Sequence, residues 1–112
     1  MEDSILGTVK QFIGGFDASY TAFDRDLIML INSELSTLFQ VGVGESAFRI
    51  TGSEETWSDL FGSRTDIETV KELICLRVRM MFDPPANSFV LDAMKEKAQE
   101  LTWRINVAVD QG

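Results

Sequence analysis

Apolar residues recur at steps of three and four along most of this chain, the spacing that places them on one face of a helix. The first such stretch follows Ser4, a good N-cap residue, and ends at Gly14-Gly15. The second follows Asp24, which we also expect to cap a helix, and ends where Gly42 suits a left-handed C-cap. Its apolar stripe is Leu27, Ile28, Ile31, Leu35, Leu38 and Phe39.

A third helical stretch covers residues 65–82. Thr65 and Glu68 have the spacing of a capping box, and Asp83-Pro84-Pro85 ends the helix because proline lacks an amide donor. One face carries Ile67, Val70, Ile74, Val78 and Met81, and the opposite side carries Leu73, Cys75, Leu76, Met80 and Phe82. A helix that is apolar nearly all round must be covered on more than one side. We therefore expect a neighbouring subunit to cover part of it.

The fourth helical stretch begins at Asn87 or Ser88. Its apolar residues, within an arc of about 100°, are Val90, Leu91, Met94, Ala98, Leu101 and Ile105. Trp103 lies about 170° from the centre of that arc, beside Arg104. It is either an interface anchor, a common role of aromatic residues next to arginine, or it packs beneath the N-terminal segment. The last two helices should form an antiparallel pair that buries Ile74, Val78, Leu91 and Leu101.

The middle of the chain is less regular. Residues 48–51 alternate as in a short strand ended by Gly52, and Ser53 can then cap a turn or two of helix with Trp57, Leu60 and Phe61 inward. The segment 42–64, rich in glycine and acid, is the least regular part of the chain, so we expect it to be mobile or to contact a partner. We predict an all-α fold: one domain over residues 1–112, a small bundle of about four helices with a short irregular or β segment in the middle.

The amino-acid composition excludes several classes of function. Ten basic and eighteen acidic side chains give a net charge of −8, which argues against binding the phosphate backbone as the main task. No apolar run reaches the roughly 20 residues of a membrane span, and no signal-peptide pattern opens the chain. The single cysteine, Cys75, lies in the most apolar run, so we expect it in the core. These features predict a soluble protein made in a reducing cytoplasm.

The residues that usually carry catalysis are missing. Without histidine the chain lacks the commonest general base and metal ligand, and Cys75 has no histidine to activate it. Carboxylate pairs such as Glu96 and Glu100 are explained by a solvated helix face. We therefore predict no enzyme, no metal and no cofactor.

Three groups of residues carry a family resemblance. The first is the run from Val70 to Pro85, with Phe82-Asp83-Pro84-Pro85 at its end, the second is Ser88-Phe89-Val90, and the third is Glu100 to Asn106, with the Trp103-Arg104 pair. Together they resemble the head–tail connector (adaptor) proteins of long-tailed bacteriophages. The likeness is strongest over 70–106 and weaker in the first half. Thr102 stands where family members usually have a glutamate, which changes surface charge only.

The resemblance implies a structural virion protein, made in the host cytoplasm, whose copies form a dodecameric ring beneath the portal protein. The ring would extend the DNA channel, let DNA pass without specific binding, and give a docking surface to the next head-completion or tail protein. In this family the C-terminal helix and tail engage the portal, which implies a contact through Trp103, Arg104, Ile105 and Asn106, with the tail of about residues 106–112 partner-bound or mobile. We expect Phe48, Arg49, Ile50 and Met80 to face the ring neighbour, with the tail side as the alternative for residues 48–50.

A rival function comes from the charge alone. A small acidic helical regulatory protein, antitoxin- or anti-repressor-like, would cover a basic partner. It predicts a monomer or dimer with a tight basic ligand, whereas a connector predicts ring formation or portal binding.

Overall fold

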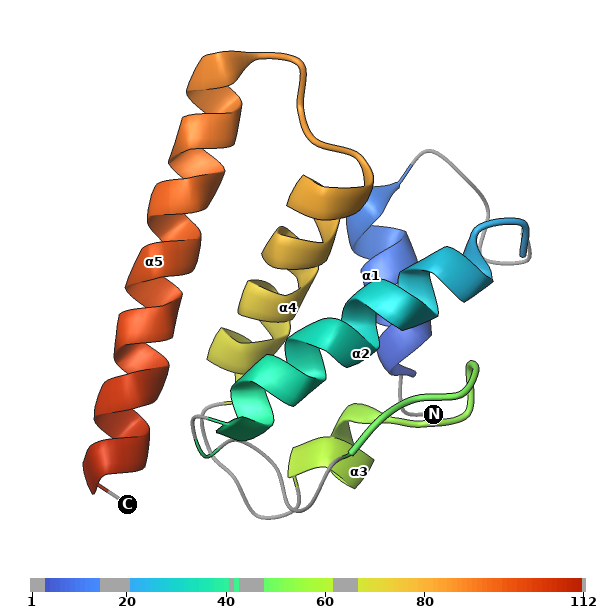
Figure 1. The fold of residues 1–112 in the computed structure, drawn as a ribbon, viewed down its shortest axis with the longest axis horizontal. Coiled ribbons are helices and arrows are strands. Elements are labelled where there is room, and N and C mark those ends of the chain that lie inside the picture. Colours follow the sequence, from blue (N-terminus) through green and yellow to red (C-terminus); the bar gives the residue numbers. More distant parts are fainter. Residues whose placement is uncertain (1–3, 15–20, 41, 43–47, 62–66, 112) are drawn as a thin grey trace.

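A computed structural model of the chain describes residues 4–14, 21–40, 42, 48–61 and 67–111, and within them it forms five helices and no strand (Figure 1). The helices are α1 (Ile5–Ile13), α2 (Asp24–Gln40), α3 (Trp57–Phe61), α4 (Ile67–Phe82) and α5 (Ser88–Gln111). The all-α class is confirmed. The helix in addition to the four long ones, α3, is the turn or two of helix predicted near Trp57. Trp57 and Leu60 are buried as expected.

Helix α4 is the centre of the fold. It packs against α1, α2 and α5, and it runs antiparallel to α5 (Figure 1). Ile74 and Val78 on one side and Leu73 and Cys75 on the other are all buried. Three helices of the same chain thus cover most of α4, and the neighbouring subunit expected over it stays a prediction for its end, where Met81 is 48% exposed.

The pairing of α4 with α5 buries Ala98, Leu101 and Ile105, while Leu91 is only half-buried. The prediction for Leu91 is wrong because the two helices differ in length. With 24 residues against 16, α5 is about 36 Å long and α4 about 24 Å. The first turns of α5 consequently extend past the end of α4 (Figure 1), and Val90 there is 47% exposed.

Several predicted helix ends are confirmed. Ser4 Oγ accepts a hydrogen bond from the Gly7 amide at 2.9 Å, and Asn87 Oδ1 accepts one from the Phe89 amide at 2.8 Å. Gly14 and Gly42 follow their helices with φ of 72° and 99°, the left-handed region that glycine enters without strain. Thr65, of the predicted capping box, lies outside the described residues.

Two predicted caps are wrong. Asp24 is the first residue of α2 rather than its cap, and its Oδ1 lies 2.8 Å from Nζ of buried Lys10. For α3 the cap is Thr56, not Ser53. Thr56 Oγ1 accepts from the Asp59 amide at 3.3 Å, and the Thr56 amide donates to Asp59 Oδ2 at 2.9 Å. This is the reciprocal arrangement of a capping box with aspartate in the second position.

The predicted strand at residues 48–51 is also absent, which confirms the irregular alternative. The side chain of Asn32 takes the place of a partner strand: its Nδ2 donates to the Ile50 carbonyl at 2.9 Å, and its Oδ1 accepts from the Ile50 amide at 2.7 Å. Glu55 then accepts hydrogen bonds from the amide and hydroxyl of Thr51. These bonds satisfy the backbone of Ile50 and the amide of Thr51 without a sheet.

Removing volume at the centre of α4 should be costly. Ile74 is fully buried, so we expect Ile74→Ala to lower the free energy of unfolding by about 2–5 kcal/mol. Val90→Ala, on the exposed part of α5, is the control and should change it by less than about 0.5 kcal/mol. Urea melts of both variants measure this. A loss below about 1 kcal/mol for Ile74→Ala would contradict the central position of α4.

Candidate partner-binding surfaces

The outer face of α5 presents Trp103. Its side chain is 66% exposed, so α1 does not cover it and the packing alternative is wrong. The other tryptophan shows the contrast: Trp57 is only 6% exposed, and its Nε1 donates to Thr8 Oγ1 at 2.9 Å. A large aromatic ring left in solvent is a natural anchor for a partner.

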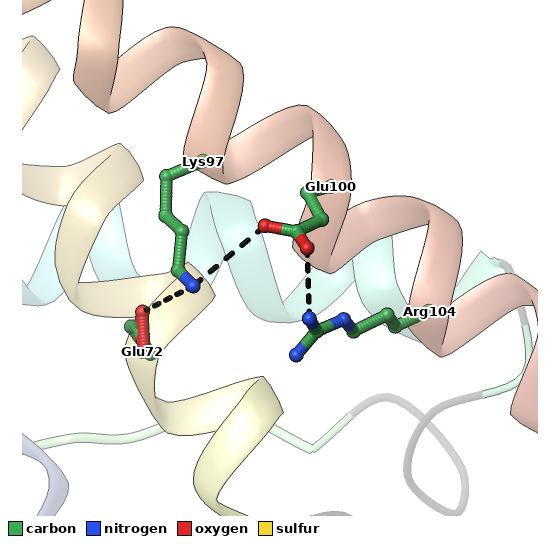
Figure 2. Close-up of polar contacts among 4 residues, drawn as sticks. All are labelled: Glu72, Lys97, Glu100 and Arg104. Carbon is green, nitrogen blue, oxygen red and sulfur yellow. Dashed lines mark hydrogen bonds and ion pairs between the residues drawn. The ribbon is translucent and has the colours of Figure 1, made fainter.

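A chain of charged side chains lies beside Trp103. Figure 2 shows Glu100 between two cations, with Arg104 Nη2 2.7 Å from Oε1 and Lys97 Nζ 3.7 Å from Oε2. Lys97 also lies 3.8 Å from Glu72 of α4, so the chain joins the two helices. Arg104 and Glu100 stand one helical turn apart on α5, the spacing at which such pairs form. Because these groups are half exposed, each pair contributes only about 0.2–0.5 kcal/mol.

The remaining residues predicted for the portal contact differ in accessibility. Ile105 is 1% exposed and belongs to the core, whereas Asn106 is exposed. Ile105 therefore fixes the rotation of α5 from inside and does not itself reach a partner. The predicted tail continues as helix α5 to Gln111.

A groove of about 910 Å³ runs between α2 and residues 48–51. Phe48 is half-buried in it, Arg49 is exposed, and Ile50 is buried. Met29 and Phe39 of α2 add apolar surface and are 66% and 41% exposed. Phe48 and Arg49 thus lie at an accessible surface, whereas Ile50 is part of the core.

Met80, the fourth residue expected at the ring neighbour, lines a different groove of about 490 Å³ between α4 and α5. An ion pair that the sequence reasoning missed lies there, with Arg77 Nε 2.8 Å from Oε2 of buried Glu34. Burial raises the pKa of Glu34, and the charge and hydrogen bond of Arg77 oppose this only in part. The sequence did hold a signal for this pair: Glu34 is an acid within the apolar stripe of α2, and Arg77 is a base within the apolar stripe of α4.

Little other chemistry is available at these surfaces. Burial raises the pKa of the Cys75 thiol to about 12, which makes it a poor nucleophile. In the described ranges, no three carboxylate or thiol side chains gather closely enough to hold a metal ion. None of the described helices combines the length and apolar character needed to cross a lipid bilayer.

An all-α subunit with an exposed aromatic anchor and two open grooves has the features of an interaction protein. Residues 5–112 match the model of a family described as phage connector protein. The match spans nearly the whole chain, so the chain belongs to the phage connector protein family, a family of structural proteins of the bacteriophage head–tail connector. Searches of curated proteins and of solved structures gave no match. Membership of this family favours the connector function over that of a small acidic regulatory protein.

The buried carboxylate of Glu34 should make stability depend on pH. Because its folded-state pKa is raised, its contribution to stability is fully present below the usual value of 4.5 and is lost as the pH rises through the folded-state pKa. We expect Glu34→Gln to match the wild type near pH 4 and to become the more stable of the two towards about pH 7. Urea melts across this range measure the difference.

Glu68→Gln is the matched control, since the Glu68 side chain is 88% exposed. It should show no comparable trend. If Glu34→Gln instead loses stability relative to the wild type as the pH rises, the attraction of Arg77 outweighs burial and the assigned direction is wrong.

Proposed function

We propose that copies of this chain assemble into a dodecameric ring beneath the portal protein of the phage head. The ring extends the DNA channel and offers a surface to the next head-completion or tail protein. The observation that carries the proposal is the exposed Trp103 on the outer face of α5, the longest helix, in a chain of the phage connector family. A connector needs such an anchor outside its own core, since its work is to hold other proteins together.

The portal contact belongs to Trp103, Arg104 and Asn106, with Ile105 packed behind them. Trp103 supplies apolar area that loses water on contact. Arg104 can leave Glu100 at small cost, because that pair is exposed, and can then donate two parallel hydrogen bonds to a carboxylate of the portal.

The net charge of −8 suits a protein that surrounds DNA without binding it. Acidic side chains on the inner wall of the ring repel phosphates, so DNA passes without sticking. The same charge leaves few cations to neutralise a phosphate backbone, which is where non-specific DNA affinity comes from. No cofactor takes part in this function.

The portal contact can be tested by truncating its anchor. We expect Trp103→Ala and Arg104→Ala to melt like the wild type while losing affinity for the portal protein of the same phage. A loss of 2 kcal/mol at one contact is about thirtyfold. The measurement is a pull-down of each purified variant with portal, beside a thermal melt of the variant alone.

Phe12→Ala is the control, because Phe12 is an aromatic residue of α1 that is 40% exposed and outside the proposed contact. It should retain portal binding. Wild-type binding by Trp103→Ala would place the contact elsewhere. Unfolding of free Trp103→Ala would show that the tryptophan serves the fold.

A further inference from the structure

The start of α5 is an apolar projection that the portal contact does not use. Phe89 is 84% exposed, more than any other large apolar side chain of the described residues, and Val90 beside it is 47% exposed. The projection is ordered, because Asn87 Oδ1 accepts hydrogen bonds from the amides of Phe89 at 2.8 Å and Val90 at 3.3 Å. It also stands clear of the rest of the molecule, since α5 begins beyond the end of α4 (Figure 1).

An acid accompanies this projection. Asp92 is exposed and lies three residues after Phe89, so the two side chains share one side of α5. Asp92 makes no ion pair with any described residue. The start of α5 therefore offers, together, an aromatic ring and a carboxylate that pairs with none of the described cations.

The groove between α2 and residues 48–51 has the complementary character. Its apolar surface comes from Met29, Phe39 and Phe48, and its volume of about 910 Å³ is ample for an aromatic side chain. Among the described residues that line it, Arg49 is the one cation; it is exposed and makes no ion pair with another described residue. The polar backbone of Ile50 is already bonded to Asn32, so a ligand need not satisfy it.

We propose that the start of α5 of one copy docks in this groove of the next copy, with Phe89 against Met29 and Phe48 and Asp92 paired with Arg49. The proposal rests on the ring proposed above and identifies the contact that closes it. Charge complementarity selects this occupant, since the groove carries a cation and the projection carries an acid beside its aromatic ring.

The placement of the two surfaces determines the kind of assembly. The start of α5 and the segment 48–51 lie at opposite corners of the molecule (Figure 1), so the contact joins two different patches. A contact between different patches repeats head to tail and forms a ring when the rotation closes. Because α5 supplies both this projection and Trp103, the same helix would set the ring contact and the portal contact.

Charge reversal with rescue tests the pair. The variants are Asp92→Arg, Arg49→Asp and the chain carrying both, and the readout is the number of copies bound to purified portal in native mass spectrometry. We expect each single reversal to weaken the contact by about tenfold or more and to reduce ring occupancy, and the double reversal to restore it. Phe89→Ala should weaken the contact by about thirtyfold.

Glu96→Arg is the matched control, an equal change of charge one turn further along α5, and should assemble normally. The melting temperature of every variant should match that of the wild type, because each altered side chain is exposed. Full rings from the single reversals, or a double reversal that stays defective, would overturn the proposed contact while leaving the ring itself in place. If the wild type never binds the portal in multiple copies, the proposed ring is wrong, and the contact proposed to close it is wrong as well.

Discussion

Helix α4 is apolar on nearly every side, and the burial of its surface is the constraint on which the rest of the fold depends. Three helices, α1, α2 and α5, surround it, so that Leu73 and Val78 on different sides are both removed from water. A subunit whose central helix is already covered does not need a neighbour in order to fold. The association surfaces proposed for it are accordingly separate from its core, on the outer faces of α5 and α2.

Burial of charge supports this arrangement at two places. Lys10 joins α1 to the start of α2 through Asp24, and Glu34 joins α2 to α4 through Arg77. Each pair has one buried partner, Lys10 or Glu34, and adds little net stability, but removing the more exposed partner, Asp24 or Arg77, leaves that buried charge uncompensated and is costly. They fix the position of α2 relative to α4, and with it the groove that α2 forms with residues 48–51.

Features that depend on neighbours in sequence could be predicted, such as the caps at Ser4 and Asn87 and the outward position of Trp103. Features that depend on distant residues could not. The apolar pattern of α4 shows that it must be covered but not by what, and the exposure of Leu91 depends on the unequal lengths of two helices. Asn32 replaces a partner strand for Ile50 across 18 positions of sequence, which no local pattern encodes. Arg49 shows the same limit. Its place at an interface could be predicted, but its apolar neighbours on α2 could not, because they are distant from it in sequence.

The central claim is that a self-sufficient subunit uses its outer surfaces to assemble on the portal. The most direct measurement is the mass of the complex formed when the purified chain of 12.6 kDa is mixed with purified portal protein. The account predicts one ring of twelve copies added to each portal, from a free chain that is folded beforehand. A portal that retains no copies, or a chain that folds only in the complex, would contradict it.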